Sequence, residues 1–288
     1  MEDVFNQFAE WIKDMIMPCL MSTLSSMFDS VNNEVGGIAT DMGTTPAAFS
    51  PEVFRMIRTV SENVIMPIAG MILTFVACYE LIQMIISHNN LANIEIWILF
   101  KWVIKTFIAV ELITHTFDFT MAVFEVAQHV IDNAGGVITD TTAIDASDLA
   151  TMEDTIRAMN VWAVFFLFFQ VWLINLITWL LSKIIFVIIY ARMLEIYMWV
   201  SLAPIPFATF GNHEQGMIGQ NYVKSLLALG FQGFLILICV GIYAVLIKSL
   251  TFSSDIIGSI WGVMGYTILL TYSLFKTGSI AKSIFQSH

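Results

Sequence analysis

The side chains of this chain that could do chemistry lie inside its apolar segments, at spacings that a helix would bring onto one face. At 100° per residue they share one half of the helix surface, and several are one turn apart, so they could hydrogen-bond along that face. Ionisable groups in a membrane span are costly, and they usually face a bundle interior or water. The set, called the polar stripe below, is Lys101, Lys105, Glu111, His115 and Asp118.

Two interpretations of the polar stripe stay open. The stripe could line an aqueous path or a seam between subunits. Alternatively, the helix is simply polar, and its lower half, which continues with Glu125, His129 and Asp132, has left the bilayer. The first interpretation suits residues 101–115 better, and the second suits residues 118–132 better.

A second intramembrane group is Arg192 with Glu195, three residues apart and therefore close enough on a helix to pair. Structural pairing, which lowers the cost of burying both charges, is the favoured role. The helix that carries them should end at Pro204 and Pro206, because neither proline has a backbone N–H to donate.

Small and polar residues mark where helices would approach one another. Glu80 and Gln83 share a face of the first expected span and could bond across helices. Small residues let helices approach backbone to backbone, in one chain or between chains. The glycines in such positions are Gly230, Gly233, Gly258, Gly262 and Gly265.

Catalytic and metal-binding patterns are missing from the sequence. The run His213-Glu214-Gln215-Gly216-Met217 begins like a zinc-protease helix, but its last position is not the second histidine. The three cysteines are far apart, and there is no phosphate-binding loop or nucleophile elbow. We therefore expect no enzyme activity, no cofactor and no metal site.

The composition is that of a membrane protein. Of the 288 residues, 58% are hydrophobic and 12% are charged, whereas a soluble domain has about 25% charged residues. The net charge is -11, and all but 3 of the 23 acidic residues precede residue 160. No basic patch of the kind that binds a nucleic-acid backbone is present.

Apolar runs long enough for the bilayer, about 20 residues each, predict an all-α, polytopic transmembrane helix bundle with about five or six spans. Because the run 159–209 is too long for one crossing, we expect a tight turn near Ser182-Lys183. The fused alternative gives five crossings. The expected spans are 62–86, 94–116 (continuing as a helix to about 131), 159–182, 184–206, 224–248 and 256–275.

The expected organisation is sequential. Residues 1–50 comprise an amphipathic helix over 4–31 and a linker at 35–51. The helix would lie at the membrane interface or on a partner subunit, or it would pack on the chain's own bundle. Ser50 and Pro51 predict a helix start. Residues 51–131 hold the first two spans, 132–158 an acidic polar loop, and 159–288 the C-terminal bundle with a short tail.

The distribution of Lys and Arg predicts a multi-pass cell-membrane protein with a cytoplasmic C-terminus, since Lys276 and Lys282 lie in the tail. With six spans the N-terminus is also inside, although Lys101 and Lys105 oppose that arrangement. Five spans would place the two ends on opposite sides.

Several strings resemble the TrbL-like conjugal transfer membrane proteins of Gram-positive integrative and conjugative elements, counterparts of the polytopic inner-membrane subunit of type IV secretion systems. The likeness keeps its order along nearly the whole chain. The strings are FRMIR (54–58), IMPIAG (65–70), CYELIQ (78–83), FKW (100–102), LITHTFD (112–118), ARMLEIY (191–197), APIP (203–206), GFQGF (230–234) and FKTGSIAK (275–282).

The resemblance implies a non-enzymatic subunit that forms a homo-oligomer in the membrane lipid. It would be part of the channel or platform that passes single-stranded DNA with its relaxase, beside other secretion subunits including the transfer ATPases. In the better-known relatives the N-terminus is extracytoplasmic and the C-terminus cytosolic, which conflicts with six spans. The alternative function is a small-solute or ion transporter that uses the polar stripe.

Overall fold

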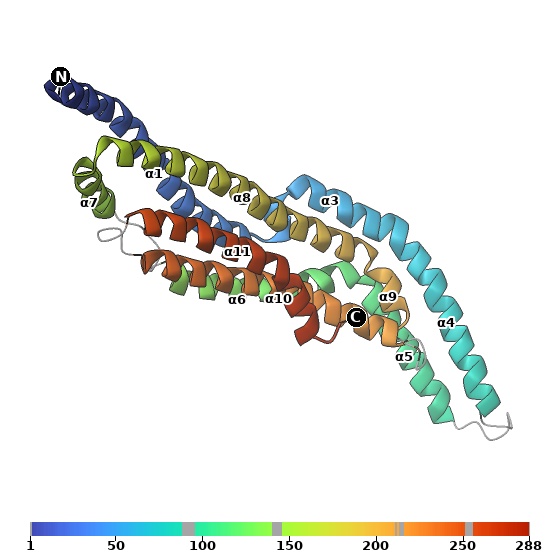
Figure 1. Cartoon of the computed structure of the whole chain (residues 1–288). Helices are drawn as coiled ribbons and strands as arrows, with labels where there is room; N and C mark the ends of the chain where they lie inside the picture. The colour runs from blue at the N-terminus through green and yellow to red at the C-terminus, as the bar shows by residue number, and fades with distance from the viewer. Residues whose placement is uncertain are drawn as a thin grey trace. The chain divides into compact units, whose positions relative to one another are not determined.

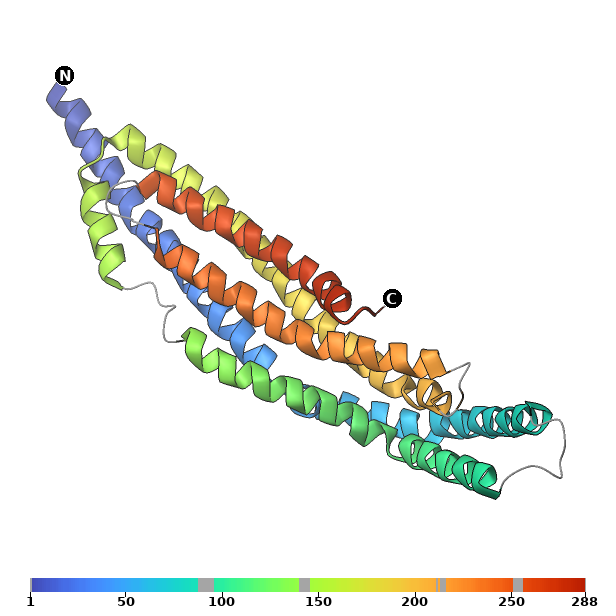
Figure 2. The ribbon, with the colours of Figure 1, turned by 90° about the horizontal axis from the view of Figure 1, so that it is seen from below.

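The chain is built from helices, so the predicted all-α fold is confirmed. The computed structural model describes residues 2–87, 96–139, 146–210, 212, 216–250 and 256–287, and no strand occurs among them (Figures 1 and 2). The helices are α1 (Glu2–Gly43), α2 (Pro46–Phe49), α3 (Pro51–Val60), a π-helical segment (Ser61–Ile65), α4 (Met66–Ser87), α5 (Ile96–Thr114), α6 (Thr116–Thr139), α7 (Ala146–Arg157), α8 (Val161–Leu202), α9 (Pro204–Ala208), α10 (Gly216–Lys248) and α11 (Ile256–Ile284).

The chain forms two compact units, and four helices contribute residues to both. Unit 1 comprises residues 1–43, 132–189 and 235–277, and unit 2 comprises residues 44–131, 190–234 and 278–288. Unit 1 therefore contains α1, α7 and parts of α6, α8, α10 and α11. Within unit 1, α1 lies beside the unit 1 parts of α8, α10 and α11 (Figures 1 and 2).

Helix α1 is longer than the sequence predicts and packs within unit 1. Its buried apolar residues recur at three- and four-residue steps, the spacing of a helix seam. The linker expected from residue 35 is wrong up to Gly43, because Gly36 and Gly37 lie inside the helix. Burial of Val35, Ile38 and Met42 offsets the roughly 1 kcal/mol that each helical glycine costs. The seam is Met17, Leu20, Leu24, Met27, Val31, Val35, Ile38 and Met42.

The expected helix start is confirmed at Pro51, with Ser50 at the N-cap position. The helix then widens into a π-helical segment at Ser61–Ile65 before α4. Pro67 gives a physical reason, because it has no N–H to donate to the carbonyl four residues earlier. Wide turns of this kind are frequent at functional sites, and this one carries Glu62.

Helix α8 corrects the expected turn near Ser182-Lys183, because residues 161–202 form one unbroken helix. The pair contains no glycine or proline, so nothing in the local chemistry ends the helix there. At 1.5 Å per residue its 42 residues extend about 63 Å, roughly twice the hydrocarbon thickness of a bilayer. The expected third and fourth spans are therefore fused into one helix, as in the alternative, while the number of crossings stays a prediction.

The segment expected as an acidic loop, 132–158, is helical over most of its described part. Helix α6 continues to Thr139, and α7 covers Ala146–Arg157. The α7 residues Met152 and Ile156 are one turn apart and fully buried in unit 1, so packing holds the segment as a helix. Acidic side chains such as Glu153 and Asp154 can point to water from its other side.

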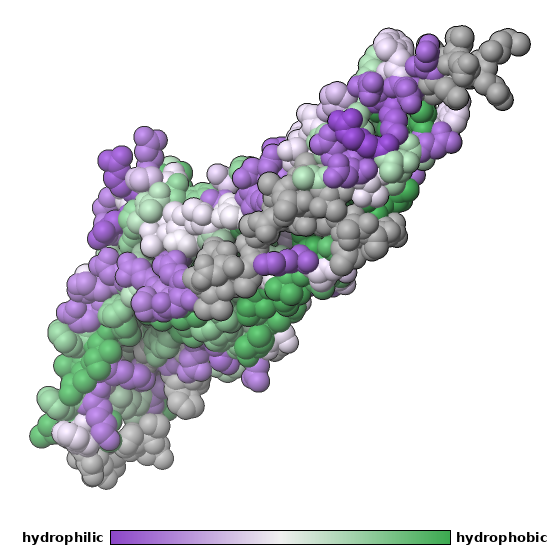
Figure 3. Space-filling model, turned by 90° about the vertical axis from the view of Figure 1, so that its left-hand side faces the viewer, coloured by the Kyte–Doolittle hydropathy of each residue, from purple (hydrophilic) through white to green (hydrophobic). Residues whose placement is uncertain are grey.

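The protein is a membrane protein with a polytopic helical bundle. Four segments among the described residues are long and apolar enough to span a bilayer: Pro51–Ile86, Val161–Ala208, Gly216–Lys248 and Ile256–Ile284. The chain itself leaves most of each apolar window uncovered, and broad apolar areas reach the surface in the view of Figure 3. Two differences separate this set from the expected spans. Helix α8 is one helix, and the expected span 94–116 carries four charged residues, which are Glu95, Lys101, Lys105 and Glu111.

Candidate functional site

The polar stripe lies on α5 and the first turn of α6, within unit 2, and all five of its side chains are exposed. The expected single helix is interrupted at His115, between Thr114 and Thr116. The backbone N–H of His115 still donates to Glu111, and that of Phe119 to His115, so the helical bonding continues across the junction. The Nδ1 atom of His115 lies 3.4 Å from a Glu111 oxygen, as the one-turn spacing predicts.

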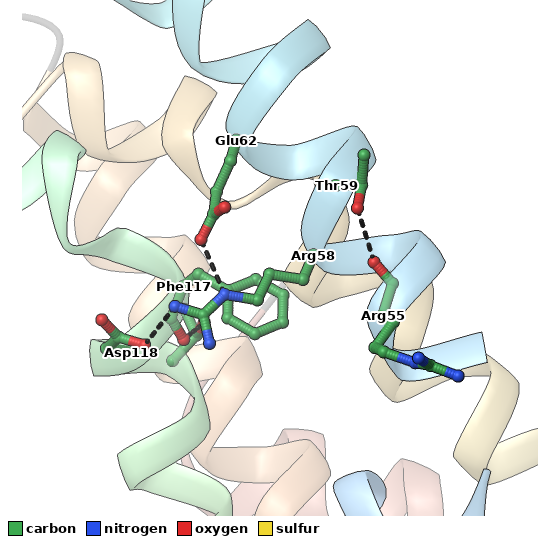
Figure 4. Close-up of polar contacts among 7 residues, drawn as sticks. Arg55, Arg58, Thr59, Glu62, Phe117 and Asp118 are labelled. Carbon is green, nitrogen blue, oxygen red and sulfur yellow. Dashed lines mark hydrogen bonds and ion pairs between the residues drawn. The ribbon is translucent and has the colours of Figure 1, made fainter. Parts of the chain in front are cut away.

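At the junction the stripe meets charges from α3 and the π-helical segment (Figure 4). Arg58 donates from Nε to Glu62 at 2.7 Å, and its Nη2 lies 3.6 Å from an Asp118 carboxylate oxygen. The same guanidinium lies 5.4 Å from the centre of the Phe117 ring. A guanidinium can hold two acceptors at once, so Arg58 connects two helical segments that are distant in sequence.

Further along α5, Lys105 forms an ion pair with Glu80 on α4. The Nε1 atom of Trp102 also donates to the Ala77 carbonyl at 3.2 Å, so two polar contacts join α4 to α5. Glu80 thus bonds across helices, as its position predicts. Gln83, expected to do the same, donates to Tyr79 on its own helix at 3.0 Å.

Reversing one charge of this ion pair is expected to destabilise the protein, because Lys105→Glu places a carboxylate opposite Glu80. The cost should lie between that of an exposed pair in water, up to about 1 kcal/mol, and that of a charge at a bilayer centre, about 3 kcal/mol. The double variant Glu80→Lys with Lys105→Glu restores opposite charges and should recover most of this loss. Thermal unfolding of the purified protein in detergent measures both.

The comparison of the single variant with the double variant can also contradict this role of Lys105 and Glu80. Equal unfolding temperatures for the single and double variants would mean that Lys105 and Glu80 do not stabilise the helix pair.

Arg192 on α8 is a buried charge, with 5% of its surface exposed. Its Nη2 lies 3.5 Å from the carbonyl oxygen of Gly230 on α10, in donor geometry. A Cβ on Gly233 would lie 2.5 Å from the same Nη2 and 2.8 Å from Ile131 Cδ1. Gly233 is therefore a glycine because the guanidinium occupies the space that a side chain would need.

Glu195, the expected partner of Arg192, lies within 3.7 Å of Lys282 near the end of α11. It also remains near enough to Arg192 to interact electrostatically. Pairing between Arg192 and Glu195 stays a prediction. The structure adds Lys282 as an ion partner, a contact between residues 87 positions apart that helical spacing cannot reveal.

The other glycines predicted to lie at close helix approaches differ in what surrounds them. A Cβ on Gly230 would lie 3.2 Å from Ala127 Cβ on α6, a close helix approach within unit 2. A Cβ on Gly262 would meet the Leu250 side chain at 2.9 Å, whereas one on Gly265 would meet nothing within 4 Å. Gly258 is exposed on α11.

Helix α8 ends at Leu202, two residues before the first of the two prolines. Pro204 begins the short helix α9, and Pro206 lies within it. Helix α9 packs against both α4 and α5 in unit 2.

Glu34 is a polar residue of unit 1 that the sequence did not single out. It lies on α1 beside the buried seam, and the Ser182 hydroxyl of α8 donates to it. Burial raises the pKa of the Glu34 carboxyl, although the Ser182 hydrogen bond and the Lys183 charge oppose that shift. An acid one residue from Val35 in an apolar three- and four-residue repeat was the available signal.

These contacts position charges and close helix approaches, and they supply no reactive group. Within the described ranges, no three His, Cys, Asp or Glu side chains gather into a metal site. His213 and Glu214 of the protease-like run lie outside the described residues. The arrangement joins helices and pairs charged groups within the chain.

Residues 31–204, more than half of the chain, match the protein family described as TrbL/VirB6 plasmid conjugal transfer like protein. The match includes the polar stripe, its partners on α3 and α4, and Arg192 with Glu195. No curated protein and no solved structure matches the chain.

Proposed function

Because the chain belongs to the TrbL/VirB6 plasmid conjugal transfer like family, we propose that it is a non-enzymatic structural subunit of a conjugative type IV secretion channel. In this role it forms part of an oligomeric platform or pore through which the DNA–protein substrate passes. The observation that carries the proposal is the exposed polar stripe on an otherwise apolar helix.

In a membrane, the side chains of Glu111 and His115 in the stripe must contact protein or water instead of lipid. Both side chains are more than half exposed, while neighbouring α5 residues such as Phe107 and Val110 are exposed and apolar. Charged groups facing hydrocarbon are costly, so protein or water must meet them. A second copy of the chain, or an aqueous path between copies, satisfies this requirement and makes the subunit a homo-oligomer.

The remaining partners follow from the family. They are other secretion subunits, including the transfer ATPases, and single-stranded DNA travelling with its relaxase. We place the C-terminus on the cytoplasmic side, where Lys276 and Lys282 would lie under the positive-inside rule. We divide the chain functionally into the N-terminal part (1–50), the first two spans (51–131), the acidic segment (132–158) and the C-terminal bundle (159–288).

A small-solute or ion transporter is the second candidate, favoured by the same stripe of ionisable groups. The two functions differ in assembly. A channel subunit should purify in detergent as a homo-oligomer together with other transfer proteins, and should not move solutes when reconstituted alone in liposomes. Native mass and liposome flux of the purified chain test both points. A monomer that catalyses solute flux would contradict the channel assignment.

A further inference from the structure

A groove on α5 has lysines among otherwise apolar lining residues, and the contacts described above do not explain this arrangement. It has a volume of about 370 Å³ and lies within unit 2. Ile104, Ile108 and Leu112 form one side of its apolar part, and Phe210, which follows α9, forms the other. Because Ile104 and Ile108 are 42% and 52% exposed, the groove opens to whatever surrounds the helix.

One end of the groove is basic. Lys101 and Lys105 both line it, together with the aromatic ring of Trp97. Lys105 is paired with Glu80, whereas the Lys101 ammonium lies 5.8 Å from the centre of the Trp97 ring. Tryptophan and lysine are typical residues of the level at which lipid headgroups meet hydrocarbon.

The spacing along α5 matches one membrane leaflet. Lys101 and Leu112 are 11 residues apart, which is about 16 Å along a helix axis. One leaflet of a hydrocarbon core is about 15 Å thick. A headgroup at Lys101 would therefore leave an acyl chain long enough to follow the groove as far as Leu112.

We propose that this groove is a binding site for an anionic phospholipid. The phosphate contacts Lys101, with Lys105 beside it, and one acyl chain lies along Ile104 and Ile108 against Phe210. A lipid with a net negative charge is selected because basic pockets between membrane helices attract anionic headgroups. A zwitterionic lipid has the same acyl chains, but its headgroup has no net charge to attract the lysines.

Native mass spectrometry of the detergent-purified full chain, titrated with phosphatidylglycerol or phosphatidylcholine, tests the site. The wild type should bind phosphatidylglycerol about fivefold more tightly, the preference expected from one lysine near an anionic headgroup. Lys101→Gln should remove the preference, and Lys101→Arg should keep it. Lys276→Gln is the matched control, because Lys276 also lies 5.8 Å from an aromatic ring centre, that of Tyr272.

Three results would overturn the assignment. Equal affinity of the wild type for the two lipids would show that the site does not select an anionic headgroup. A loss of preference in Lys276→Gln as large as that in Lys101→Gln would mean that any surface lysine has the effect. Displacement of the lipid by glycerol 3-phosphate at equal concentration would indicate a phosphate site that does not use the groove.

Discussion

Substituting Gly233 by valine is expected to destabilise the protein strongly and to lower its yield in the membrane. The new Cβ would lie 2.5 Å from Nη2 and 2.9 Å from Cζ of Arg192, and 2.8 Å from Ile131 Cδ1. Arg192 is buried, so its guanidinium cannot move aside into solvent without leaving the Gly230 carbonyl. Overpacking costs about 1–3 kcal/mol, and loss of the long 3.5 Å contact with the Gly230 carbonyl adds to that cost.

The matched control is Gly265→Val, since a Cβ there meets nothing within 4 Å of the same chain. Both substitutions remove a helical glycine and gain the same few tenths of a kcal/mol in helix propensity, so the difference between them isolates the clash. Thermal unfolding in detergent should show a lower midpoint for Gly233→Val alone. Adding Arg192→Ala to Gly233→Val should recover part of the lost stability, because it removes the guanidinium that the new side chain would overlap.

Equal midpoints for Gly233→Val and Gly265→Val would contradict this account of Arg192 and Gly233. A double variant with Arg192→Ala that is no more stable than Gly233→Val would show that Ile131 alone causes the clash.

Local chemistry along the chain predicted the elements well where a single residue determines them. Pro51 begins a helix after Ser50, α8 ends two residues before Pro204, and the 3.4 Å contact of Glu111 with His115 follows from one-turn spacing. These features depend on the backbone geometry of a few neighbouring residues, and that local geometry can be predicted from the residue types alone.

Predictions based on length or isolated glycines failed for a physical reason. The turn near Ser182-Lys183 assumed that each apolar run fills one bilayer crossing, yet α8 continues without a break. Gly36 and Gly37 suggested a linker, but burial along α1 outweighs their weak helix propensity. Packing between distant segments decides such cases, and a single sequence does not contain it.

The partners of the candidate site were the least predictable part. Arg58 with Asp118, Lys105 with Glu80, and Glu195 with Lys282 join residues that are 25 or more positions apart. Helical periodicity indicates which residues share a face, but not which other helix that face meets. The sequence therefore singled out Asp118, Lys105, Glu80 and Glu195, but it did not show which residue each of them would meet.

Deleting this chain from a donor cell is expected to abolish conjugative DNA transfer while leaving growth and solute uptake unchanged. The family places the protein in the conjugal transfer apparatus. If it is the channel subunit proposed above, the substrate cannot cross the membrane without it. A transporter that merely shares the polar stripe would instead alter uptake. Supplying the wild-type chain in trans should restore transfer.

The frequency of transfer from donors with an in-frame deletion, measured with and without the complementing chain, tests the central claim most directly. The account predicts transfer at the background of the assay for the deletion and near wild-type frequency after complementation. Wild-type transfer frequency from the uncomplemented deletion would contradict the assignment of this protein to the secretion channel.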